Sequence, residues 1–446
     1  MSKKKSLKST SESFYQKTDF LGAFILIAYG FITVLTPNLN TLDSNGPKFL
    51  ALALLNFIVF GIVLYAEKYR KHVIKFFTNP IGIAYSILMV FSLISFTQAI
   101  NVSESIIHFS KIFTTFTATW LVSVIVFDNK NNLLPLAIAM SLLLIFDSFS
   151  VFSEISKYIK GELKSILLIK TVYSNKNILT SSIFIKIPFA LWLMFFFKKR
   201  LRYLGIFTLF MASLAIFFMS SRAFYLASLV LIILVLLYGT VRFIQTKKNS
   251  HFLNAGIVTG VFLLSFTIFS FIEKNAYPKE TREQRSVAGR LSTITTKKES
   301  NARLKIWNWA FQVYKESPIL GVGLGNFKIN VLKYENKTKP NYIYSYKVHN
   351  DFIETFVETG IFGGISFIAI FVFVLWYFAK VLLKNLEGDY LVWYFLVFFG
   401  MVGYFFDAFF NFPQDRPEIQ ALFALFLGAT IGIRLNEKKQ SNNTDN

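Results

Sequence analysis

The sequence predicts an all-α integral membrane protein with about twelve transmembrane helices, and three observations support this fold class. First, 54% of the 446 residues are hydrophobic, 53 of them Phe, and the mean hydropathy is +0.50. Second, only 16% are charged, whereas soluble chains carry about a quarter. Third, apolar runs of about 20 residues, long enough to cross a bilayer as helices, recur along the chain.

Twelve apolar segments are predicted to be the transmembrane helices. The first nine lie within 18–272 and the last three within 349–434, separated by one long loop at 273–348. Basic tails precede and follow them, at 1–17 and 435–446. The segments lie near 18–37, 48–66, 80–98, 105–127, 132–152, 178–197, 203–220, 222–240, 252–272, 350–380, 390–410 and 418–434.

Lysine and arginine residues predict the orientation of these spans. If the N-terminus is cytoplasmic, the tail 1–17, the connection 67–79 and the tail 435–446 all lie inside, and all are basic. Outside connections such as "NVSES" (101–105) carry no Lys or Arg. The positive-inside rule therefore predicts that both termini face the cytoplasm and that the loop 273–348 lies on the outer face.

Charge and cysteine content exclude several functions. The net charge of +22 is explained by basic cytoplasmic loops, so nucleic acid is not predicted as a partner. The absence of cysteine excludes thiol catalysis and zinc-thiolate or iron–sulfur sites. The outer loop holds fifteen Lys plus Arg against six Glu, which suits an anionic partner such as lipid phosphate. The alternative is a solvated, partly disordered loop.

The second half of that loop has a local pattern. "ARLKIWNWAFQVYKES" (302–317) places apolar residues at helical spacing, and Pro318 ends the run. We predict an amphipathic helix at the outer membrane surface. "GVGLGNF" (321–327) then predicts a tight turn. No strand precedes it, so a Rossmann or P-loop nucleotide site is rejected.

Polar residues that interrupt the apolar segments gather at the predicted outer face. Arg222 ends the short connection "SSR" (220–222), so its guanidinium either reaches headgroups or binds an anion. His349, one of four histidines, begins the tenth span. Asp351, Glu354 and Glu358 follow on one helix face. Asp351 complements the helix dipole, whereas Glu358 lies deeper, where a carboxylate usually faces a polar cavity. No paired-histidine spacing favours a metal site.

These motifs together resemble the O-antigen ligase and O-antigen polymerase superfamily. The signature is His349-Asn350, nine residues, then Gly360 and Gly363. "SRAFYLASLVL", "NARLKIWNWAFQVYKESPILGVGLGNF" and "FNFPQDRPE" are similar to further family elements, in the family's order. One departure is that Gly364, Ile365 and Ser366 follow, where the ligase signature usually has Thr, which leaves the subfamily open.

The resemblance implies a multi-pass glycosyltransferase of the bacterial inner (cytoplasmic) membrane whose active site faces the periplasm. Such enzymes transfer a glycan from an undecaprenyl-diphosphate carrier to an acceptor hydroxyl, without a cofactor, a nucleotide sugar or a metal, and invert the anomeric centre. When the family's residue roles are carried over to the matching positions, the resemblance implies that His349 is the general base and that Arg222 and Arg303 bind the diphosphate. The substrate-binding candidates are Asn177, Arg290, Asn350, Glu358 and Arg416.

Four functions remain open at this stage. A ligase uses the lipid A core of lipopolysaccharide as its acceptor, and this is the first hypothesis. A polymerase uses a second lipid-linked glycan, and a protein O-glycosyltransferase uses a hydroxyl side chain. A polysaccharide transporter also fits twelve spans with both ends inside. Transporters are expected to show internal repeats and polar residues at the membrane midplane. We find no clear repeat, and the polar groups lie at one face, which favours an enzyme.

Overall fold

The fold class is confirmed by a computed structural model in which every regular element described is helical. The structure describes residues 18–37, 39, 41, 43–163, 169, 171, 176–277, 299–335, 344–383 and 390–444. Arg290 and most of the first half of the long loop lie outside these residues. The predictions made for that segment therefore stay predictions.

Each of the twelve predicted apolar segments coincides with a helix. In the first half of the bundle the elements are α2 (Phe20–Leu35), α3 (Gly46–Tyr65), α4 (Glu67–Arg70), η1 (Val73–Thr78), α5 (Pro80–Ile94), η2 (Ser95–Gln98), α6 (Val102–Asp128), η3 (Lys130–Asn132) and α7 (Leu133–Ile159). The second half contains α8 (Lys176–Phe196), α9 (Lys199–Met219), α10 (Arg222–Thr246), α11 (Asn249–Ala276), α14 (Glu299–Glu316), α15 (Phe327–Asn330), η5 (Val331–Lys333), α16 (Asp351–Leu383), α17 (Tyr390–Phe410), η6 (Pro413–Asp415) and α18 (Pro417–Thr444).

Membrane-spanning length separates one helix from the others. Among the described residues, eleven helices are long and apolar enough to cross a membrane. The first, α2, has 16 residues, which at 1.5 Å per residue is about 24 Å and shorter than a hydrocarbon core of about 30 Å. Helix α2 is therefore apolar and packed in the bundle, but shorter than the other eleven spans, of which the shortest is α5 continued by η2, with 19 residues.

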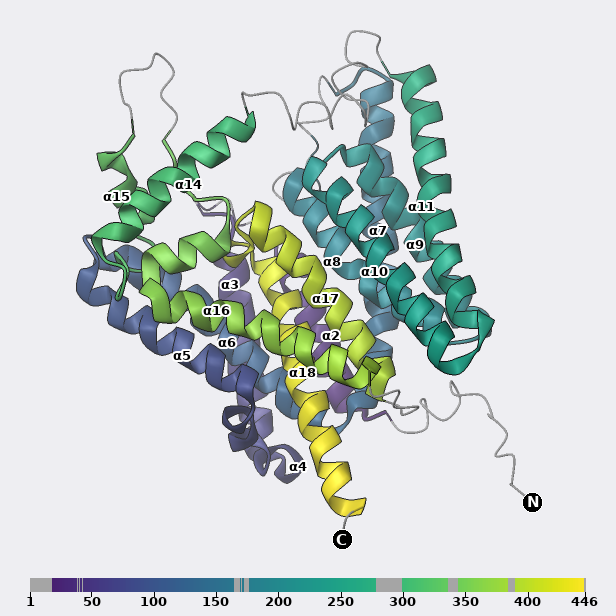
Figure 1. Cartoon of the computed structure of the whole chain (residues 1–446), viewed down its shortest axis with the longest axis horizontal. Helices are drawn as coiled ribbons and strands as arrows, with labels where there is room; N and C mark the ends of the chain where they lie inside the picture. Colours follow the sequence, from purple (N-terminus) through teal and green to yellow (C-terminus); the bar gives the residue numbers. More distant parts are fainter. Residues whose placement is uncertain are drawn as a thin grey trace.

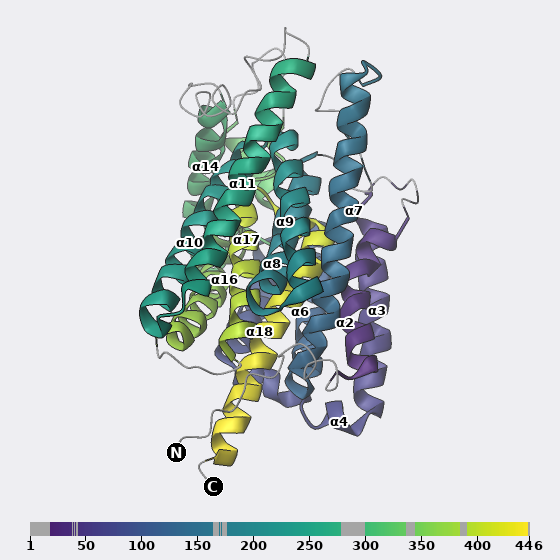
Figure 2. The same cartoon turned by 90° about the vertical axis from the view of Figure 1, so that its right-hand side faces the viewer.

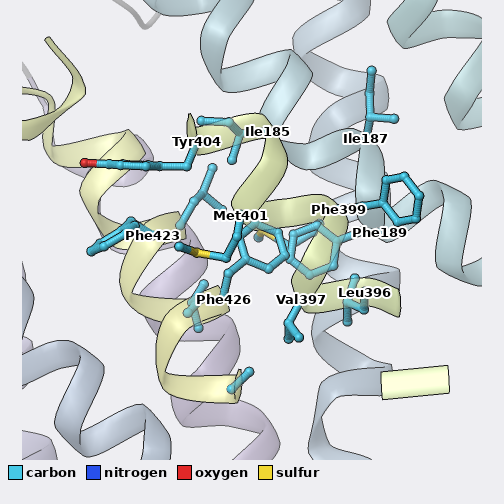
Figure 3. Packing of buried hydrophobic residues seen from close by; sticks show 14 of the residues in the cluster. Ile185, Ile187, Phe189, Leu396, Val397, Phe399, Met401, Tyr404, Phe423 and Phe426 are labelled. Carbon is cyan, nitrogen blue, oxygen red and sulfur yellow. The ribbon is translucent and has the colours of Figure 1, made fainter. Parts of the chain in front are cut away.

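Helices α8, α17 and α18 form the centre of the bundle. Between 78% and 94% of their most apolar windows is buried, against 28% for α11 and 33% for α3. Figure 3 shows apolar side chains of these three helices meeting, and the rings of Phe189 and Phe426 stack at 5.0 Å. A helix that is apolar on all sides is expected in such a position. Figure 1 shows α5 and α6 on one side of α18, and α9 and α11 on the other.

The two ends of the bundle differ. Helix α4 and the C-terminal end of α18 lie at one end, and α14 lies at the opposite end in both views (Figures 1 and 2). The predicted loop helix is confirmed as α14, which ends at Glu316, just before Pro318. We call the end of the bundle that carries α14 the α14 end.

Candidate active site

Gly360 interrupts α16 where the helix meets the turn 321–327. Its φ of 72° and ψ of −173° are essentially restricted to glycine. A Cβ atom at Gly360 would lie 2.0 Å from the carbonyl oxygen of Ile319, and one at Gly321 would lie 2.3 Å from that of Glu358. Two glycines from separate motifs thus allow the backbones of the turn and of α16 to approach closely.

Backbone hydrogen bonds join the turn to this bend. The amide of Ile361 donates to the carbonyl of Pro318. The carbonyls of Val357 and Glu358, in the turn of α16 before the bend, accept from amides of the glycine turn. The three bonds are Ile361 N to Pro318 O (2.9 Å), Val322 N to Val357 O (2.9 Å) and Gly323 N to Glu358 O (3.2 Å).

The carboxylate of Glu358 holds the other half of the turn. It is 4% exposed and accepts hydrogen bonds from the amides of Gly325 (2.7 Å) and Phe327 (3.1 Å). Both of its oxygens are therefore engaged by backbone. This gives Glu358 a structural role that the sequence leaves open, and the substrate contact predicted for it stays a prediction.

His349 precedes α16 with a left-handed backbone, φ 58°, which is uncommon for a residue other than glycine. Its neighbour Val348 is fixed from both sides. The Val348 amide donates to Glu354 Oε2 (3.0 Å), and Trp307 Nε1 of α14 donates to the Val348 carbonyl (3.2 Å). The unusual conformation of His349 is thus held by contacts to two helices.

The residues after His349 tie the start of α16 to the connection between α17 and α18. Asn350 is buried, and its Oδ1 accepts from the amide of Ile353 (3.1 Å), so it caps the helix. Asp351 Oδ2 accepts from the amide of Gln414 (3.0 Å), whose side chain donates to Thr355 Oγ1 (3.2 Å). Asn350 therefore supports the fold, and the substrate contact predicted for it stays a prediction.

Cations and an aromatic ring surround His349. The imidazole meets the ring of Phe412 edge-on at 5.1 Å, and the guanidinium of Arg416 lies 4.6 Å from that ring. The pKa of His349 is lowered to about 4, first by burial and then by the charges of Arg303, Arg416 and Lys347. The imidazole is therefore neutral at pH 7 in the substrate-free protein.

Arg416 is 3% exposed, yet its charge is only partly paired. Its Nη1 lies 3.6 Å from Asp407 Oδ1, and Asp407 also accepts from Asn411 Nδ2 (2.7 Å) and from the hydroxyl of Ser181. Within the described part of the chain, Nε and Nη1 of Arg416 make no hydrogen bond. A buried guanidinium with unused donors can accept an anionic group.

Arg222 and Asn177 begin neighbouring helices. Arg222 is the first residue of α10, after a tight connection in which Ser220 is left-handed (φ 51°). Phe224 contacts Phe184 at 5.5 Å between ring centroids, which places the start of α10 beside α8. Asn177, the second residue of α8, is exposed. Ser181, one turn after Asn177 in α8, donates to Asp407, so the start of α8 lies beside Asp407.

The structure thus brings His349, Arg303 and Arg416 together, and it adds Lys347, for which the sequence indicated no role. Lys347 Nζ lies 2.8 Å from Glu354 Oε1 and 2.5 Å from Asp415 Oδ2. The only sequence signal that could have indicated a role for Lys347 is its position two residues before His349.

An internal cavity of about 20 Å³ lies beneath this region. Glu354 and Glu358 line it together with Ser92, whose buried hydroxyl makes no hydrogen bond to any described residue. The cavity has room for one water molecule, which would satisfy that hydroxyl. Among the described residues, no three His, Asp or Glu side chains are grouped closely enough to hold a metal ion.

Comparison with protein families gives one match, to O-antigen ligase, over residues 206–368. No curated protein matches the chain. The matched segment runs from α9 into α16 and contains Arg222, Arg303 and His349, whereas Asn177 and Arg416 lie beyond it. The family supports an activity of the ligase or polymerase type and, in general, lipid-linked glycan substrates. The match supports the resemblance: residues 206–368, a little over a third of the chain, are similar to the O-antigen ligase family.

Proposed function

We propose that the protein is an O-antigen ligase-like glycosyltransferase. It takes a glycan from an undecaprenyl-diphosphate carrier and transfers it to a hydroxyl of the lipid A core. The observation that carries this proposal is the neutral His349, held in a left-handed conformation beside Arg303 and Arg416. A neutral base next to fixed cations suits an acceptor hydroxyl and an anionic leaving group.

The bond changes follow from this placement. The acceptor oxygen forms a bond to the anomeric carbon, and its proton passes to the imidazole of His349. The bond from that carbon to the diphosphate oxygen breaks, and its electron pair leaves with the diphosphate. Attack opposite the leaving group inverts the anomeric centre, and no step draws on a metal or a cofactor.

Arginine side chains stabilise the departing diphosphate. Guanidiniums form paired hydrogen bonds to phosphate oxygens and are worth most where negative charge develops. We assign Arg222 and Arg303 to this role, and Arg416 with its unused donors to substrate binding. A bound diphosphate also offsets the cations that lower the pKa of His349. Substrate binding therefore raises that pKa toward the working pH, where a general base is most effective.

The charge of the two bundle ends supports a periplasmic site in the inner membrane. The end opposite α14 carries α4, with Lys68 and Arg70, and the last turns of α18, with Lys438 and Lys439. Basic residues concentrate on the cytoplasmic side of membrane proteins. The α14 end then faces the periplasm.

A surface-glycan gel from a deletion strain tests the function. Loss of polymer from the lipid core, with accumulation of carrier-linked polymer, supports the ligase. Single repeat units on the core would instead indicate a polymerase. Loss of glycan from a protein would indicate a protein glycosyltransferase. Accumulation of lipid-linked units on the cytoplasmic side would indicate a transporter.

Complementation with variants tests the site. His349→Ala should fail to restore the polymer while reaching the membrane at the wild-type level. His251→Ala, in α11 at the opposite end of the bundle, is the matched control and should restore it. Full restoration by His349→Ala would contradict the base assignment.

A further inference from the structure

We propose that Lys347 is a positioning residue that holds His349 in its working conformation through a buried ion-pair cluster. We define the Lys347 cluster as Lys347, Glu354, Asp415 and Lys111. This inference rests on the proposed function, because it concerns how the general base is placed.

Lys347 bridges two carboxylates from different parts of the fold. It is 8% exposed, and its Nζ lies 2.8 Å from Glu354 Oε1 in the first turn of α16 and 2.5 Å from Asp415 Oδ2 in η6. Burial disfavours the charge, but the two carboxylates outweigh it and raise the pKa of Lys347. The ammonium therefore stays charged and paired throughout the physiological pH range.

The same carboxylates fix the backbone on both sides of the site. Glu354 uses its second oxygen to accept the amide of Val348 (3.0 Å), immediately before His349. Asp415 immediately precedes Arg416, and its other oxygen lies 3.2 Å from Lys111 Nζ of α6. Lys347 therefore joins the segment that carries the base to the segment that carries a cation beside it.

Strain at His349 explains why such a cluster is needed. A left-handed conformation is strained for a residue other than glycine and persists only where its surroundings impose it. Lys347 and Val348, the two residues before His349, supply three of the contacts that do so, through the Lys347 side chain and the Val348 amide. Without the ammonium, Glu354 and Asp415 repel one another, and the segment is free to relax away from φ 58°.

Lys347 also acts on His349 electrostatically. The charges that lower the pKa of His349 come from Arg303 on α14, from Arg416 after η6 and from Lys347 on its own segment. The charged groups that face Lys347 are Asp415, Glu354 and Glu358, and His108 of α6 and Asp351 of α16 also feel its charge. Removing the Lys347 charge therefore raises the pKa of His349.

The test compares purified Lys347→Met with wild-type enzyme, using a synthetic undecaprenyl-diphosphate glycan as donor. Misplacement of a catalytic group by about 1 Å costs about 100-fold in rate. We expect kcat to fall by about that factor with the donor KM within threefold of wild type, and the acid limb of kcat/KM to move to higher pH. Lys333→Met is the matched control, because Lys333 forms a surface ion pair with Glu316 (2.6 Å) in the same loop, and its kcat should be unchanged.

A second variant guards against misfolding. Lys347→Met combined with Glu354→Gln removes one cation and one anion, leaves Asp415 with Lys111, and keeps an amide oxygen for Val348. It should show the same loss of kcat. Wild-type kcat and an unmoved acid limb in either folded variant would overturn the positioning role. If His349→Ala is also fully active, the proposed base itself is wrong; if His349→Ala is inactive, only the role of Lys347 fails.

Discussion

Gly360→Ala should destabilise the protein more than a single methyl group ordinarily does. The φ and ψ of Gly360 lie in a region that costs other residues roughly 1–3 kcal/mol. The new Cβ would lie 2.0 Å from the carbonyl oxygen of Ile319 and 2.4 Å from its carbon, so backbone must move. Losing two of the three backbone hydrogen bonds between α16 and residues 318–323 adds roughly 2 kcal/mol. We expect a total loss of roughly 3–5 kcal/mol in unfolding free energy.

The assay is a detergent-unfolding titration in mixed micelles followed by the fluorescence of the six tryptophans. Gly256→Ala is the matched control, because a Cβ there meets nothing within 4 Å and the residue lies inside α11. It should gain up to about 1 kcal/mol from helix propensity. If Gly360→Ala unfolds at the same detergent fraction as wild type, the contact between the turn and the bend does not hold the site together.

Three further outcomes are expected. His349 works as the neutral base, and its pKa is lowered to about 4, so kcat/KM should fall only as the pH drops through about 4. The acid limb of kcat reports the substrate-bound enzyme and should lie at higher pH. Acid limbs of kcat and kcat/KM that coincide near pH 6.5 would contradict this. Arg222→Lys should lose about 100-fold in kcat, since an ammonium cannot reproduce a paired guanidinium contact; wild-type turnover would make Arg222 a headgroup anchor. Lys186 pairs with the buried Asp147 at 2.6 Å, so Lys186→Met leaves that carboxylate without its cation and should cost about 3–5 kcal/mol of unfolding free energy. The same detergent titration measures this loss, and an unchanged midpoint would contradict it.

The sequence predicted the helices well because hydrophobic length and helical period are local properties. Each of the twelve apolar segments is a helix, and the loop helix ends just before Pro318, as its pattern indicates. The shortness of α2 was not foreseen, because the predicted segment 18–37 runs two residues beyond the helix at each end. How the helices pack depends on contacts between distant segments, which no local pattern contains.

The candidate site was predicted in part. The placement of His349 at the start of a helix, and the turn at 321–327, follow from local pattern. The contact between that turn and Gly360 joins segments about forty residues apart, and the Lys347 cluster joins Lys347 to Asp415 across almost seventy. In the structure the hydrogen bonds of Asn350 and Glu358 go to backbone, which local pattern did not indicate, and the substrate contacts predicted for them stay predictions.

The most direct test of the central claim is glycan transfer by the purified protein in liposomes. The donor is an undecaprenyl-diphosphate glycan labelled in the sugar, the acceptor is a lipid A core preparation, and the two enzymes compared are wild type and His349→Ala. The account predicts that wild type moves the label to the acceptor with inverted anomeric configuration, while His349→Ala binds the donor equally well but transfers at no more than about one hundredth of the rate. Equal transfer by both enzymes, or retention of configuration by wild type, would contradict it.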